Sequence, residues 1–118
     1  MEDGKRACIA IIAASIHNKR NYSSVFDYSQ SSYIPVSVNF TNNGYVSAYD
    51  YHRGGYLTGN IPNLFDYVSS SHINLLFQNS QITGFDFGTS SHFSIQVTNN
   101  HVSVFDHNCG CWFYYSVS

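Results

Sequence analysis

Five aspartates, each set between aromatic residues, recur along the chain. They are Asp27, Asp50, Asp66, Asp86 and Asp106. The first four have Phe or Tyr on both sides, whereas Asp106 lies between Phe105 and His107. A carboxylate before a tight turn can accept hydrogen bonds from backbone N–H groups and Ser hydroxyls a few residues further on. We predict that each aspartate fastens one turn, because recurrence in every repeat suits a structural role better than an active site.

A second group of residues could bind a metal ion. His107, Cys109 and Cys111 place an imidazole and two thiols close together, and such donors bind soft metals or, as two thiols, act in redox chemistry. A single Cys-x-Cys is a weak signal, however, and these residues occupy the turn that Thr89-Ser90-Ser91 occupies one repeat earlier. Both interpretations stay open: a metal site, or a packed turn. The sequence predicts no other cofactor.

The rings around the aspartates form the best candidate for a binding surface. Candidate ligand-binding residues are Tyr49, Tyr51, Tyr67, His72 and His92. If these rings are exposed beside Ser and Asn, they can stack on a sugar or on an aromatic ligand. If they are buried, they belong to the core or to a contact with a second copy of the chain.

Composition excludes several classes of function. Only 10% of the 118 residues are charged and the net charge is −2, which argues against binding nucleic acid or an anionic membrane surface. Glu occurs once, and there is no Gly-rich phosphate loop or nucleophile elbow, so an enzyme is not indicated. Three cysteines cannot all pair with one another, which favours a reducing, cytoplasmic location.

The aspartates mark a repeat of two strands and two turns. They are spaced 23, 16, 20 and 20 residues apart, and a ring follows six residues after each one. In the fourth repeat, residues 82–87 are the first strand and residues 92–97 the second, and residues 92–97 alternate between apolar and polar side chains, as a strand with one buried face does. The first strands carry apolar groups on both faces, so we expect them to be more buried. Asn79-Ser80 and Asn99-Asn100 suit the return turns, because Asn tolerates positive φ.

These repeats predict a single all-β domain over residues 1–118. We expect an antiparallel meander of hairpins with about 10–11 strands, curled into a barrel or folded as a sandwich. The alternative is a β-solenoid with two strands per coil. The short step of 16 residues favours the meander, because a hairpin can shorten both arms and keep its register.

The N-terminal segment is apolar and shows no convincing helical period. We therefore predict no helix and interpret residues 7–17 as the opening strand of the sheet. The turn at residues 18–21 would connect it to the strand that ends at Asp27.

The repeated Phe/Tyr-Asp-Tyr units followed by Ser-Ser-Tyr/His resemble those of short uncharacterised bacterial proteins. Proteins of that kind are carried, among other places, on mobile integron gene cassettes. The resemblance begins near Val25 and covers most of the chain. It implies a bacterial, intracellular, β-rich protein and supplies no catalytic residues.

We expect a non-enzymatic binding or self-assembly module that associates through uncharged aromatic strands. Its partner would be a second copy of the chain, with a small molecule or glycan as a possible ligand. The alternative is a small β-barrel carrier or enzyme with a cavity lined by Asp, His and Tyr.

Overall fold

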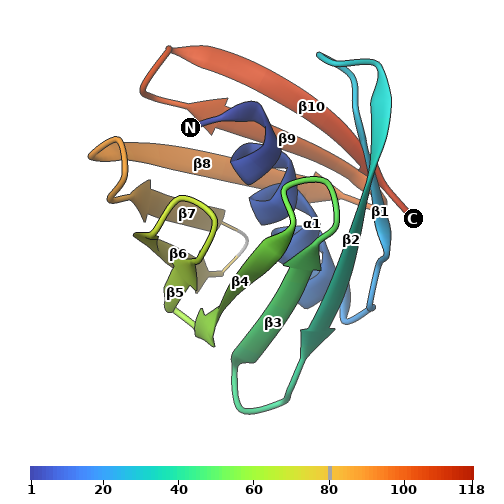
Figure 1. Cartoon of the computed structure of the whole chain (residues 1–118). Coiled ribbons are helices and arrows are strands. Elements are labelled where there is room, and N and C mark those ends of the chain that lie inside the picture. Colours follow the sequence, from blue (N-terminus) through green and yellow to red (C-terminus); the bar gives the residue numbers. More distant parts are fainter. Residues whose placement is uncertain (80) are drawn as a thin grey trace.

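The computed structural model describes residues 1–79 and 81–118, which form one helix and ten strands (Figure 1). The elements are α1 (Asp3–Asn18), β1 (Ser24–Asp27), β2 (Ser32–Phe40), β3 (Tyr45–Asp50), β4 (Gly55–Asn60), β5 (Asn63–Asp66), β6 (Ser71–Gln78), β7 (Gln81–Asp86), β8 (Ser91–Thr98), β9 (His101–Asp106) and β10 (Cys111–Val117). The predicted strands at 82–87 and 92–97 are thus present as β7 and β8 within one residue. The predicted turn at Asn79-Ser80 includes a residue outside the described part.

The strands form a closed antiparallel barrel in which each strand pairs with its neighbours in the chain. Strands β1 and β10 close the barrel, with Val25 opposite Val117 and Asp27 opposite Tyr115. The predicted barrel-like meander is confirmed. The sandwich and the two-strand solenoid are wrong, because a sheet that closes on itself pairs both edges of every strand.

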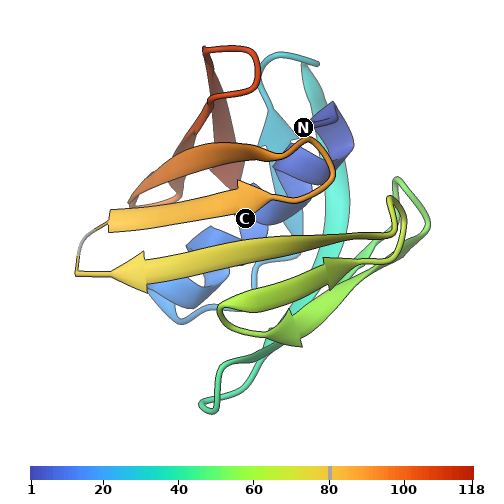
Figure 2. The ribbon, with the colours of Figure 1, turned by 90° about the vertical axis from the view of Figure 1, so that its left-hand side faces the viewer.

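Side chains alternate between the interior and the exterior along each strand. In β9, Val102, Val104 and Asp106 are buried, while the residues between them lie on the outer face. The five turns that follow the aspartates gather at one end of the barrel, called here the aspartate end. The opposite end carries the remaining connections (Figure 2). The C-terminus lies there too, because the Val117 N–H donates to the Asn100 carbonyl in the turn between β8 and β9.

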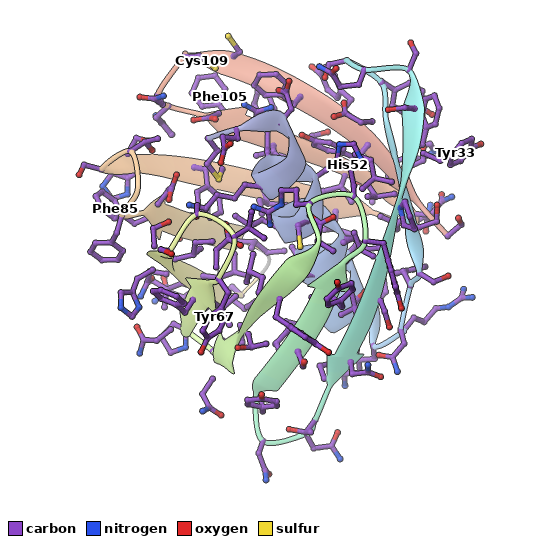
Figure 3. The ribbon with its side chains drawn as sticks, viewed as in Figure 1. Tyr33, His52, Tyr67, Phe85, Phe105 and Cys109 are labelled. Carbon is purple, nitrogen blue, oxygen red and sulfur yellow. The ribbon has the colours of Figure 1, made fainter. Side chains whose placement is uncertain are left out.

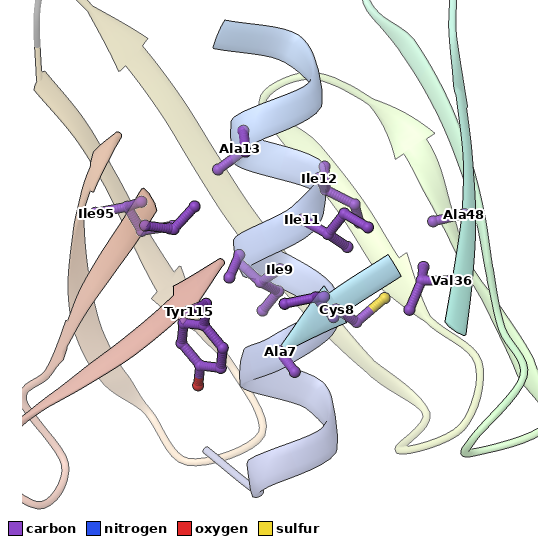
Figure 4. Packing of buried hydrophobic residues seen from close by; sticks show 14 of the residues in the cluster. Ala7, Cys8, Ile9, Ile11, Ile12, Ala13, Val36, Ala48, Ile95 and Tyr115 are labelled. Carbon is purple, nitrogen blue, oxygen red and sulfur yellow. The ribbon is translucent and has the colours of Figure 1, made fainter. Parts of the chain in front are cut away.

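The helix α1 runs through the interior of the barrel, so the prediction of a strand at residues 7–17 is wrong. Every residue from Lys5 to Ser15 is buried. Figure 4 shows Ile9, Ile11 and Ile12 surrounded by strand residues such as Val36, Ala48, Ile95 and Tyr115. A helix enclosed on all sides needs no polar face, and its sequence therefore lacks the amphipathic period that marks a surface helix.

The C-terminal end of α1 is fixed by local structure. The helix ends where Lys19 adopts a left-handed conformation with φ of 55°, and the Arg20 N–H donates to the Ser15 carbonyl at 3.0 Å. Four alanines along its length leave room for the strands to approach. Along the described part of the chain, no helix combines the length and the apolar character needed to cross a membrane.

Candidate functional site

Each aromatic-Asp-aromatic triplet is split between the two sides of the barrel wall. Because side chains alternate along a strand, the aspartate points inward and its two neighbours point outward. All five aspartates are buried. Figure 3 shows Tyr33 and Phe85 projecting outward from opposite sides of the barrel. The repeat therefore builds two layers at the aspartate end: carboxylates inside and rings outside.

The carboxylates hold the turns in the same way in all five repeats. One oxygen of each accepts a hydrogen bond from the backbone N–H two residues further on, at 2.9–3.3 Å. Hydroxyls add to this, as where Ser69 donates to Asp66 at 2.6 Å and Thr89 donates to Asp86 at 3.0 Å. These are the partners that the turn chemistry of the sequence predicts.

Two cations from α1 and the amino group of Met1 meet two of the carboxylates inside the barrel. Lys5 Nζ lies 2.6 Å from Asp86 Oδ1. Asp106 Oδ2 accepts from the amino group of Met1 at 2.9 Å and from Arg6 at 3.3 Å. Burial alone would raise the pKa of Asp106, but hydrogen bonds from the amino group and from the turn lower it below its ordinary value.

Asp27 differs from the other four. It is the one aspartate of the five that has no ion pair within the described residues. Ser29 binds its Oδ1 through both N–H and hydroxyl, but its Oδ2 is buried with no hydrogen-bond partner among the described atoms. The hydroxyl of Tyr115, the residue opposite Asp27 on β10, is also buried without a partner there.

This difference predicts unequal costs for two identical substitutions. Asp86→Asn removes one charge of a buried ion pair and is expected to lower the free energy of unfolding by about 3–5 kcal/mol. Asp27→Asn serves as the matched control and is expected to cost about 1 kcal/mol, since it weakens only turn hydrogen bonds. Urea unfolding followed by circular dichroism measures both. Equal losses, or no loss for Asp86→Asn, would show that the ion pair does not stabilise the barrel.

The rings on the outer face form five trios of one design. The members of each trio stand one residue before the aspartate, one residue after it and six residues after it. The trios are Phe26, Tyr28 and Tyr33; Tyr49, Tyr51 and Tyr56; Phe65, Tyr67 and His72; Phe85, Phe87 and His92; and Phe105, His107 and Trp112. The first ring contacts the other two edge-on, with centroids 4.7–5.2 Å apart. The first ring of each trio is half-buried and the other two are exposed, so the trios lie on the surface and are not core.

The second repeat departs from this design beside its trio. Its turn reads Arg53-Gly54-Gly55, where the third repeat carries three serines. Gly54 has φ of +73°, and the other repeats place Ser or Gly in the same left-handed position. At Gly55, an added Cβ would lie 2.6 Å from Val68 Cγ2, so the exposed Val68 side chain would have to shift to admit a larger residue. Two missing side chains therefore thin the surface next to Tyr56.

Arg53 stands where the third repeat has Ser69, and its longer side chain hydrogen-bonds two aspartates on the inner side of the barrel wall. Its Nε donates to Asp50 at 2.7 Å and its Nη1 donates to Asp66 at 2.8 Å, so it joins two neighbouring repeats. Burial opposes the charge of Arg53, but the hydrogen bonds that Arg53 donates to Asp66 and Asp50 outweigh it and raise the pKa of the guanidinium. Burial likewise opposes the charge of Asp66, yet hydrogen bonds from Arg53 and Ser69 lower the pKa of that carboxyl.

Two adjacent open grooves lie on this side of the barrel, and the second is lined by the turn residues Arg53, Gly54 and Gly55. The first has a volume of about 590 Å³ and is lined by Ser37, Asn39, Ser47, Tyr49, Tyr51 and Tyr56. The second has a volume of about 690 Å³ and includes Tyr45, Tyr49, Tyr56, Thr58, Tyr67 and Val68 in its lining. Tyr49, Tyr56 and Ser47 belong to both grooves. We call this region, with its five tyrosines Tyr45, Tyr49, Tyr51, Tyr56 and Tyr67, the tyrosine surface.

The predicted ligand-binding residues are only partly brought together. Tyr49, Tyr51 and Tyr67 lie on the tyrosine surface. His72 and His92 are the last members of the third and fourth trios and stack edge-on against the first rings of those trios at 4.8 Å.

The predicted metal set does not form a site. In residues 1–79 and 81–118, no three His, Cys, Asp or Glu side chains have an arrangement that could hold a metal ion. His107 packs against Phe105 with centroids 4.7 Å apart, and the Cys111 thiol donates to the Cys109 carbonyl at 3.3 Å. Hydrogen bonding to Cys109 raises the pKa of Cys111, which disfavours the thiolate that binds metals.

Sequence reasoning missed Arg53 and the helix cations Lys5 and Arg6. The sequence did hold a signal for them. The chain has only five Lys and Arg residues, and five repeated aspartates in an apolar wall require cationic partners. The sequence also indicated where the second groove lies, because one turn carries Arg-Gly-Gly where another carries three serines.

Comparison of the chain with protein-family models, with curated proteins and with solved structures gives no match. The geometry of the site therefore carries the functional argument.

Proposed function

We propose that the protein is a non-enzymatic binding module that takes a small ligand on the tyrosine surface. The observation that carries the proposal is the pair of adjacent grooves that share Tyr49 and Tyr56. Their volumes fall within the range of about 300–1,000 Å³ that is usual for ligand sites. Exposed tyrosines offer apolar faces together with hydroxyl groups, and such surfaces bind ligands of mixed polarity.

The chemistry of the lining favours binding over catalysis. Among the described residues, neither groove is lined by a carboxylate, an imidazole or a thiol. The aspartates at this end lie on the inner side of the wall, where they hold turns and cations. The carrier alternative has less support, because α1 and its side chains occupy the barrel interior that a cavity would need.

Self-assembly through strand edges also has less support than ligand binding. The closed barrel pairs every described strand on both sides, so no edge is available for a second copy. A cytoplasmic location belongs to the proposal, since Cys8, Cys109 and Cys111 are free thiols.

The test is a thermal-shift screen with neutral sugars, phenols and alkylammonium salts. At a concentration 100-fold above Kd, a ligand should add about 2.7 kcal/mol to the free energy of unfolding and raise Tm by several degrees. Tyr51→Ala should abolish the shift. Phe87→Ala is the matched control, because Phe87 holds the same position in the fourth trio and is 57% exposed against 61% for Tyr51.

Two outcomes would contradict the proposal. One is a screen in which no compound shifts Tm. The other is a shift that Tyr51→Ala leaves intact or that Phe87→Ala removes equally. Light scattering on the same samples would reveal self-association as the cause of any concentration-dependent Tm.

A further inference from the structure

We infer that the ligand of the tyrosine surface is a neutral saccharide of at least two sugar rings, one ring in each groove. The inference rests on the proposed function and names the ligand class of that same site.

Outward-facing side chains of the tyrosine surface form rows across β2, β3 and β4. Cross-strand pairing places Ser37 beside Tyr49 and Tyr49 beside Tyr56 on the outer face. The next outward row, two residues along each strand, consists of Asn39, Ser47 and Thr58. Two residues correspond to about 6.7 Å along a strand, so an aromatic row runs beside a row of hydroxyls and an amide.

A pyranose ring matches this pattern. It has an apolar face of C–H groups and an edge of hydroxyl groups. With its face on Tyr49 or Tyr56, its edge can reach the side chains of Asn39, Ser47 and Thr58, which offer both donors and acceptors. A purely aromatic ligand would leave that polar row without partners, and losing hydrogen bonds to such groups costs affinity.

The charges around the grooves favour a neutral ligand. Arg53 is the charged residue that lines a groove, and its side chain is only 9% exposed. Its guanidinium is committed to Asp50 and Asp66, both on the inner side of the wall. Two carboxylates against one guanidinium disfavour an anionic ligand. A quaternary ammonium ion would gain from the tyrosine faces but has no hydrogen bonds to offer the polar row.

The two grooves share one wall. Tyr49 and Tyr56 are opposite each other on β3 and β4 and form part of both linings. Ser47 is shared as well, so its hydroxyl lies where the linkage between two sugar rings would pass. Gly54 and Gly55 keep the second groove open beside this wall. A disaccharide therefore uses both grooves, whereas a monosaccharide uses one.

The experiment compares five probes by isothermal titration with the full chain: cellobiose, maltose, glucose, choline and p-cresol. At least one disaccharide should bind, and it should bind more tightly than glucose. Ser47→Val should weaken its binding about tenfold, corresponding to one lost hydrogen bond. Ser103→Val is the matched control, because Ser103 holds the equivalent outer position on β9 and should leave the affinity unchanged.

The outcomes separate this inference from the proposed function. Binding of choline or p-cresol, lost in Tyr51→Ala, without binding of either disaccharide would overturn the saccharide inference and support the module itself. Absence of binding by all five probes would overturn the inference. The wider thermal-shift screen would then test the proposed function by itself. A disaccharide affinity that Ser47→Val leaves unchanged would also overturn the inference. Circular dichroism confirms that both valine variants are folded.

Discussion

Replacing Arg53 with methionine is expected to lower the free energy of unfolding by about 5 kcal/mol, the upper end of the usual cost of breaking a buried ion pair. The guanidinium is the ion-pair partner of both Asp50 and Asp66 in the described structure, with N···O distances of 2.7 and 2.8 Å. Its loss leaves two buried carboxylates facing the same apolar interior. Domains of this size are stable by about 5–15 kcal/mol in total, so a loss of about 5 kcal/mol removes about a third or more of the stability.

Two further variants show whether the lost ion pairs are the cause. Arg20→Met removes an exposed arginine that stacks on Tyr22, and it should change stability by less than about 0.5 kcal/mol. Adding Asp50→Asn and Asp66→Asn to Arg53→Met removes the stranded charges and should recover most of the loss, since a buried ion pair replaced as a whole is often nearly neutral.

Urea unfolding with a constant m value measures all three proteins. If Arg53→Met is as stable as Arg20→Met, the two ion pairs do not hold the second and third repeats together. If the triple variant is no more stable than Arg53→Met, the loss comes from packing around the side chain and not from unpaired charge.

The strands and the split triplets could be predicted from the sequence because both depend on short-range periodicity. Alternation in segments such as 92–97 defines two faces, and the aspartate at the centre of a triplet must then lie opposite its neighbours. Turn chemistry supplied the hydrogen-bond partners, as for Ser69 and Thr89. Whether the rings or the aspartates faced the interior could not be decided, because both faces of the first strands carry apolar groups.

The pairing of charges was beyond the sequence for a different reason. Arg53 reaches Asp66 across 13 residues, and that contact depends on how closely barrel curvature brings two turns together. Lys5 reaches Asp86 only because α1 lies in the interior. Because the helix was not predicted, the ion pairs between its cations and the buried aspartates were not predicted either.

The helix was missed because periodicity identifies a helix only when one face meets water. Residues 7–15 are apolar or small on every side, with Ile at 9, 11 and 12, and β-branched residues in a short apolar run favour a strand. The alanines at 7, 10, 13 and 14 were the remaining signal. They suit a helix that the surrounding strands must approach closely.

This enclosure predicts a large cavity effect in the middle of α1. Ile11 is completely buried, whereas Ile16 near the C-terminal end of the helix is only partly buried against the core. Ile11→Ala is expected to lower the free energy of unfolding by about 2–5 kcal/mol, because close-packed strands on all sides cannot collapse into the space. Ile16→Ala is the matched control: it makes the same chemical change, gains the same helix propensity and should cost clearly less. Thermal and urea unfolding compare the two. Equal costs would mean that the middle of α1 is no better enclosed than its end, which would contradict a helix threaded through the barrel.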